Sequence, residues 1–268
     1  MKETRSLINS LLACGIAFAM VSTLAAQTVN QGSARVVRMK GDARYKMGSN
    51  DWQPLKVGDI LRPGTLIQTA AKAHVDFVLG TGMGSASVVP TVASLGLAYQ
   101  PPSIGSAYQP SAEQNIVRMW ENTLLSIDKL TITQTGADEV TETQLDLKAG
   151  HIFGIVKKMS AASKYEIKIP NGVAGIRGSV YDILAEGVVA MQSGSAVLAY
   201  SGPNGTVLTQ VIMGKQRFDA RTGALTPLGD TENTEMENLV SALSVPPSPG
   251  VTTFYPTDKA FVNLISPH

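Results

Sequence analysis

One arginine stands among glycines in the second half of the chain, and it is the strongest candidate for chemistry in this sequence. Arg177 lies between Gly175 and Gly178, and the hydroxyl residue Ser179 follows. A guanidinium group carries five N–H donors in one plane and can bind carbonyls, a carboxylate or another anion. We predict a structural role, in which Arg177 satisfies buried carbonyls or a carboxylate. Contact with an anion or a partner peptide is the alternative.

The other residues that commonly take part in catalysis or metal binding do not stand in any recognisable motif. The histidines are His74, His151 and His268, and none has another histidine or a cysteine within five residues, so we predict no metal site and no cofactor. The glycine run 80–84 is not followed by the Lys-Ser or Lys-Thr of a phosphate loop. No serine stands in a Gly-X-Ser-X-Gly pattern. We therefore expect that the protein is not an enzyme.

Two β-strands are expected to position Arg177. Tyr165, Ile167 and Ile169 alternate with charged residues, which is typical of a half-buried strand. Pro170 should end this strand, because proline has no N–H to donate to a neighbouring strand. A second strand is expected from residue 180 to 184. The glycine-rich stretch between the two strands predicts a tight corner that holds the arginine.

The residues around this predicted corner also resemble a known family. Residues 173–179, Val-Ala-Gly-Ile-Arg-Gly-Ser, resemble the signature of the FecR domain, which usually ends Val-Arg-Gly-Thr. Ser179 stands where the family has threonine, so the hydroxyl is kept and the β-branch is lost. The resemblance covers roughly residues 34–90 and 115–220. It implies an all-β FecR-type domain over residues 34–220.

The pattern of short strands and turns agrees with an all-β fold. Short apolar runs separated by glycines predict a roll, a sandwich or a short solenoid of many strands. Residues 231–244 differ, because their apolar residues recur at helical spacing and acids stand in the first turns, so we predict one short helix there. Residues 245–268 are rich in proline and are expected to form an exposed tail.

A proline-rich segment, residues 91–114, is expected to be an insertion within the β domain. It contains a short echo, Ala-Tyr-Gln-Pro, that begins at residue 98 and again at residue 107. An exposed, extended loop is the main interpretation. The alternative is a docking arm whose Tyr99 and Tyr108 contact a partner.

The N-terminus has the pattern of a bacterial export signal. Lys2 and Arg5 precede an uncharged run from residue 6 to 26, which ends in small residues suited to cleavage. We predict a cleaved signal peptide over residues 1–26 and a location in the periplasm, the cell envelope or outside the cell. The alternative is an uncleaved anchor, because a run of about 20 residues can span a membrane. That anchor would be the chain's only contact with a membrane.

The overall composition limits the choice of partner. The 268 residues include 22 Lys and Arg against 21 Asp and Glu, and 44% are hydrophobic. A neutral chain offers no general attraction to nucleic acid, so none is expected as a partner. The FecR resemblance implies a protein or envelope-polymer partner, and we predict an exported, non-enzymatic binding domain. Two alternatives remain open: a secreted carbohydrate-binding or carbohydrate-processing protein, and a signal-transducing FecR-type regulator.

Overall fold

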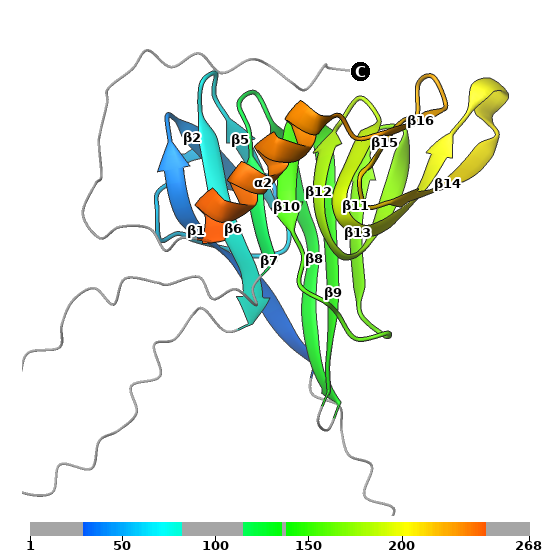
Figure 1. The fold of residues 1–268 in the computed structure, drawn as a ribbon. Helices are drawn as coiled ribbons and strands as arrows, with labels where there is room; N and C mark the ends of the chain where they lie inside the picture. The colour runs from blue at the N-terminus through cyan, green and yellow to red at the C-terminus, as the bar shows by residue number, and fades with distance from the viewer. Residues whose placement is uncertain (1–28, 82–114, 136–137, 245–268) are drawn as a thin grey trace, which may run out of the picture.

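The computed structural model describes residues 29–81, 115–135 and 138–244, and this part of the chain is almost entirely β-structure (Figure 1). The predicted signal peptide, the insertion 91–114 with Tyr99 and Tyr108, and the tail 245–268 lie outside the described residues. The strands of the first half are β1 Val29–Lys40, β2 Ala43–Met47, β3 Gln53–Pro54, β4 Ile60–Leu61, β5 Thr65–Thr69, β6 His74–Thr81, β7 Asn115–Met119 and β8 Leu124–Thr135. The remaining elements are β9 Asp138–Ala149, β10 His151–Ile155, β11 Lys164–Ile169, β12 Gly172–Leu184, β13 Val188–Ser201, the 3-10 turn η1 Pro203–Gly205, β14 Val207–Met213, β15 Gln216–Asp219, β16 Ala224–Pro227 and the helix α2 Asp230–Ser244.

Eight of the strands pair in a closed, barrel-like ring. Around the ring the order is β1, β6, β7, β10, β12, β11, β9 and β8, and β8 pairs with β1 again. Every pair in the ring is antiparallel except β9 with β11, which is parallel. This closure confirms the predicted all-β class and favours a rolled sheet over a solenoid.

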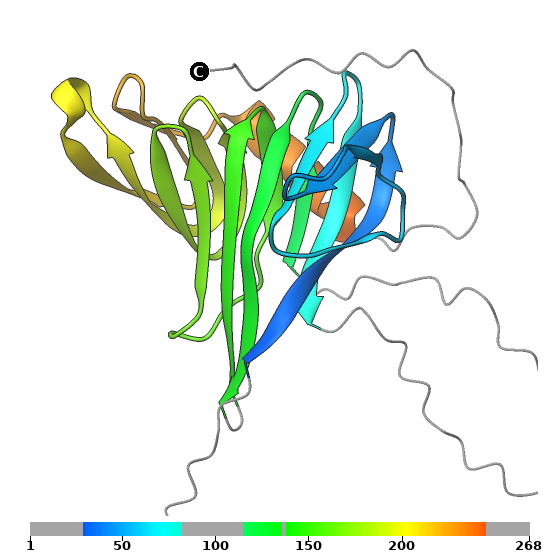
Figure 2. The ribbon, with the colours of Figure 1, turned by 180° about the vertical axis from the view of Figure 1, so that it is seen from behind.

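Two smaller groups of strands extend the ring at opposite ends of the molecule. Strands β5, β2 and β3 continue from β8, while β13, β14, β15 and β16 continue from β12. In Figures 1 and 2 the β13–β14 hairpin, in yellow, projects from the end opposite the blue β1–β2 region. As a result, β14 has β13 as a strand neighbour on one side and a free edge on the other, as far as the described residues show.

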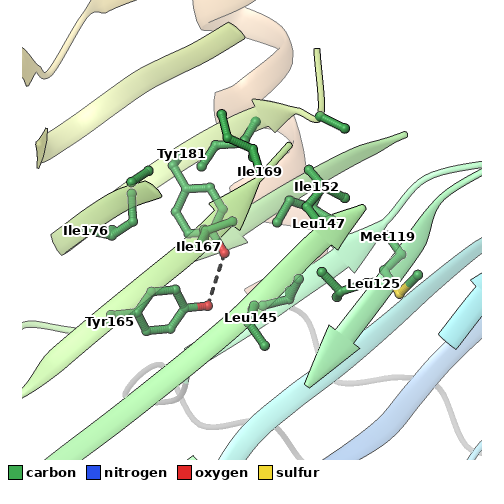
Figure 3. Close-up of a cluster of buried hydrophobic side chains, with 14 of the residues drawn as sticks. Met119, Leu125, Leu145, Leu147, Ile152, Tyr165, Ile167, Ile169, Ile176 and Tyr181 are labelled. Atoms are coloured by element: carbon green, nitrogen blue, oxygen red, sulfur yellow. Dashed lines mark hydrogen bonds between the residues drawn. The ribbon is translucent and has the colours of Figure 1, made fainter. Parts of the chain in front are cut away.

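Apolar side chains fill the ring (Figure 3). Tyr165, Ile167 and Ile169 point into it, as the alternating pattern predicts, and all three are buried. The hydroxyl groups of Tyr165 and Tyr181 lie 3.0 Å apart and form a hydrogen bond inside this core. Burial raises the pKa of both tyrosines, so both remain neutral at physiological pH.

The predicted helix is confirmed as α2, which crosses the outer face of the sheet (Figure 1). Its apolar residues Met236 and Leu243 are buried, and they pack in a second cluster with Phe153 and Ala190 of the sheet. At the C-terminal end of the helix, Arg38 Nη1 donates a hydrogen bond to the Ala242 carbonyl at 2.7 Å. Among the described residues, no helix is both long and apolar enough to cross a membrane.

A buried ion pair lies beside this helix. The Asp76 carboxylate is fully buried and accepts two hydrogen bonds from Arg118, at 2.6 Å from Nε and 2.8 Å from Nη2. Arg38 stands 3.9 Å from the same carboxylate. The alternating pattern of residues 74–79 places Asp76 on the side opposite the core. The structure shows why this side is nevertheless buried: it lies under the second apolar cluster.

Candidate functional site

The predicted corner around Arg177 is not a loop, which corrects the sequence interpretation. The chain turns at residues 170 and 171, and β12 already begins at Gly172. Residues 172–179 therefore belong to a long strand that pairs with β13. The glycine-rich pattern marks a β-bulge in this strand: Arg177 faces Ser195 and Val180 faces Ser193, so two residues of β12 lie opposite one of β13.

Ser179 closes the bulge with its hydroxyl group. This side chain is 2% exposed, and its Oγ accepts the Ser195 N–H at 3.0 Å. The same Oγ lies 2.8 Å from the Arg177 carbonyl and 3.1 Å from the Ser195 carbonyl, so its proton can be donated to either. A bulge leaves backbone groups without ladder partners, and the hydroxyl supplies partners for them. A Ser or Thr at this position is thus explained by the local structure.

Arg177 is exposed, contrary to the predicted buried structural role. Its Nη2 donates one hydrogen bond, to the Ala161 carbonyl at 3.4 Å, and that contact lies at the surface. The remaining four N–H donors of this exposed side chain make no hydrogen bond within the described part of the chain. These donors are therefore accessible from solvent, and the alternative interpretation, contact with an anion or a partner, stays a prediction.

A shallow cavity of about 230 Å³ opens beside Arg177. Lys164 and Glu166 are among its lining residues, and the Glu166 carboxylate accepts a hydrogen bond from Gln144 Nε2 at 2.9 Å. Gly175 also lines the cavity, and a Cβ atom built on it would meet nothing closer than a carbonyl oxygen at 3.8 Å. The full lining is Ser163, Lys164, Tyr165, Glu166, Gly175, Ile176, Arg177, Ser195 and Val197. The cavity thus combines the exposed Arg177 side chain with an open backbone surface at Gly175.

Exposed apolar residues lie next to the cavity on strands β12, β13 and β14. We call this set the apolar stripe: Val173, Val197, Val207, Val211 and Met213. Their exposed fractions are 37%, 46%, 72%, 51% and 52% respectively. Pairing places them on one face, because Val197 stands between Gly175 and Val211, and Met213 faces Ser195. Contiguous apolar surface of this kind often marks an interaction site.

His74 and His151 lie on a different part of the sheet, and His268 lies outside the described residues. His74 begins β6 and His151 begins β10, and Trp120 lies between them, stacked on His151 with ring centroids 5.7 Å apart. The His151 ring also contacts the Asp182 carboxylate. No group of three or more histidine, cysteine or acidic side chains in the described ranges is placed to hold a metal ion.

Sequence reasoning missed most of the cavity and the apolar stripe. The alternating pattern places Lys164 and Glu166 only on the polar side of a strand, and Val197 and Val211 belong to none of the patterns described for the sequence. One signal was available: residues 187–214 contain no Asp, Glu, Lys or Arg, although 16% of the chain is charged. The last part of this stretch, β14, is mostly exposed, so the absence of charge there indicates an apolar surface.

The two glycines of the signature should respond differently to alanine. Gly178 has a φ of +50° and a built Cβ lies 3.3 Å from Lys158 Cα, whereas Gly175 has ordinary strand geometry and open space. We expect Gly178→Ala to lower the free energy of unfolding by about 1–2 kcal/mol. Gly175→Ala serves as the matched control and should change it by less than about 0.5 kcal/mol. Urea unfolding of both variants measures the difference, and equal values would contradict the strain argument.

Two solved structures are similar to this chain over about half of its length, at a low TM-score. No family model and no curated protein matches the chain, so the FecR resemblance depends on the residues quoted above. Two solved structures of "a putative anti-sigma factor from Parabacteroides distasonis ATCC 8503", at 2.50 and 1.65 Å resolution, are similar to it. Each is 10% identical with a TM-score of 0.34, and they cover 46% and 48% of this chain. The alignment spans 56% and 57% of those chains, little more than half their length.

Proposed function

We propose that this chain is an exported, non-enzymatic β-protein of FecR type that binds a protein of the cell envelope through the sheet face around Arg177. The observation that carries the proposal is the exposed Arg177 beside the cavity and the apolar stripe. An arginine with free donors next to apolar surface is the composition of a binding hot spot. A carboxylate of the partner would accept the planar donor pair, and the apolar stripe would supply the buried area.

Carbohydrate binding receives less support from the described surface. Sugar-binding faces use open aromatic rings, and both tryptophans here carry neighbours over their rings. Arg44 and Lys46 lie 4.5 Å and 5.2 Å from the ring centroid of Trp52. Trp120 is stacked on His151 and also approached by Arg118. A FecR-type regulator would be a special case of the proposal, in which the protein partner is a signalling receptor.

The test compares Arg177→Lys with the unchanged protein. Because the side chain is exposed, we expect the unfolding midpoint to stay within error. Lysine lacks the planar pair of donors, so the affinity for the partner should fall about tenfold, in the range of a modest hot-spot residue. Binding is measured against a solubilised envelope fraction, and against purified peptidoglycan in a parallel co-sedimentation. Lys72→Arg, an exposed exchange in a turn outside this face, is the control.

Two results would contradict the proposal. Arg177→Lys could unfold more easily than the control, which would return Arg177 to a structural role. Alternatively, retention of the unchanged protein on peptidoglycan alone, with no protein bound from the envelope fraction, would favour a polymer ligand.

A further inference from the structure

We propose that the free edge of β14 pairs with the β14 strand of a second copy of this chain, in antiparallel orientation, so that two sheets join in one. This inference goes beyond the proposed function and does not rest on it. It starts from the edge itself. Proteins usually protect an edge strand with lysine, proline or a bulge, and β14, Val-Leu-Thr-Gln-Val-Ile-Met, has none of these.

Hydrogen bonds at the ends of the hairpin show which backbone N–H and C=O groups of β14 bond to β13 and which face the free edge. At the two ends of the β13–β14 hairpin, Gly202 N–H donates to the Thr206 carbonyl at 2.8 Å and Gly214 N–H donates to the Gly194 carbonyl at 2.9 Å. Hydrogen-bonded and non-hydrogen-bonded pairs alternate in an antiparallel ladder. The even-numbered residues of β14 therefore bond to β13. The odd-numbered residues direct their N–H and C=O groups toward the free edge.

Two side-chain contacts agree with this assignment. Met213 N–H donates to Gln216 Oε1 at 2.8 Å, and the Val211 carbonyl accepts Gln210 Nε2 at 2.7 Å. Both contacts lie at the surface, and in both a glutamine side chain is hydrogen-bonded to a backbone group of the free edge. A flexible glutamine can be displaced by a second strand without breaking the sheet of its own copy. Val207 and Thr209 have no strand on that side among the residues that the structure describes.

A second copy of β14 fits this edge in one complete register. With Gln210 on the two-fold axis, Val207 faces Met213 of the other copy and Thr209 faces its Val211. These are the odd-numbered residues, so the groups that face outward on one copy meet the outward groups of the other. Shifting the register by one residue would lose this match.

Charge favours a second copy over a charged partner strand. Residues 187–214 carry no charged side chain, so the two strands approach with no like charges opposed and none left unpaired. The first charged residue after β14 is Lys215, which would lie beside Gly205 of the other copy. The apolar stripes of the two copies would then continue into one another across the new pair. A C2 interface of this kind is self-complementary.

Sedimentation velocity of the full chain over a range of concentrations tests the pairing. We expect a monomer–dimer equilibrium. Val211→Lys should raise the dissociation constant tenfold or more, because it brings two like charges close together at the paired edge. Val173→Lys adds the same charge to the same face but two strands from the edge, and it should leave the equilibrium unchanged. A chain that is monomeric throughout, or a dimer equally sensitive to both variants, would overturn the proposal.

Engineered disulfides test the register and separate it from association through any other segment. In a chain carrying Cys14→Ser, which removes the native cysteine, Gln210→Cys places the two sulfurs opposite each other at a non-hydrogen-bonded pair. Such pairs have the Cα separation that a disulfide needs. We expect Gln210→Cys to form a covalent dimer under mild oxidation and Thr209→Cys, which faces residue 211, to form little. Equal cross-linking of both variants, or of neither, would contradict this pairing.

Discussion

Replacing Asp76 by alanine is expected to lower the free energy of unfolding by about 3–5 kcal/mol, one of the two largest effects we predict for a single change. Asp76 is fully buried and is paired with Arg118, whose side chain is only 10% exposed. Removing the carboxylate leaves the Arg118 guanidinium buried without its counter-charge. Arg38 also loses its acidic neighbour at the end of α2. Denaturant unfolding followed by circular dichroism measures the change.

A surface ion pair provides the control for this prediction. Lys129 Nζ and Glu142 Oε2 lie 2.7 Å apart, but their side chains are 45% and 36% exposed. Glu142→Ala should therefore cost less than about 1 kcal/mol, as exposed pairs usually do. If Asp76→Ala and Glu142→Ala had similar effects, the Asp76–Arg118 pair could not be a buried, dehydrated pair in solution.

The second large effect is expected at Gly154. This glycine faces Tyr181 across β10 and β12, and a Cβ atom built on it would overlap the Tyr181 ring and hydroxyl. The ring has no room to withdraw, because Tyr181 is fully buried and hydrogen-bonded to Tyr165. We expect Gly154→Ala to lower the free energy of unfolding by about 3 kcal/mol, at the upper end for overpacking. The midpoint temperature of thermal unfolding should then fall by about 6–12 °C.

A double-mutant cycle shows whether this steric overlap is the cause. In a Tyr181→Leu background the ring is absent, so adding Gly154→Ala should cost far less than it does alone. Additive effects of the two changes would mean that Gly154 is needed for another reason, such as its backbone conformation.

Patterns between sequence neighbours were sufficient to predict several elements. The alternation of Tyr165, Ile167 and Ile169 predicts strand β11, which ends immediately before Pro170. The spacing of Met236 and Leu243 predicts α2, and both side chains are buried as expected. These patterns can be interpreted without a partner strand because each depends only on the period of one element.

The features that depend on pairing could not be predicted in the same way. A bulge is defined by the pairing with the opposite strand, which the sequence does not show. The closely spaced glycines before Val180 are equally typical of a tight corner, so the sequence could not distinguish a corner from a bulge. Asp76 and Arg118 are 42 residues apart and meet because β6 pairs with β7. Val78 lies on the same face of β6 as Asp76 and is apolar and buried. An apolar residue on this face was the one indication in the sequence that both faces of β6 are buried.

The candidate site was partly predictable, for a related reason. The signature residues single out Arg177 in the sequence, but the exposure of its side chain depends on the β10–β11 connection, which contributes only the Ala161 carbonyl. The apolar stripe comes from three strands, and each contributes one to three members. No single segment therefore carries its pattern.

Site-specific photocrosslinking in the producing cells tests the central claim most directly. A photoreactive amino acid at Val197, in the apolar stripe beside Arg177, is compared with the same residue at Val57, which is 52% exposed in the first half of the chain. The proposed function predicts a covalent product between the Val197 probe and a different polypeptide of the envelope, and none from Val57. Equal products from both positions, or a Val197 product that contains only a second copy of this chain, would contradict it.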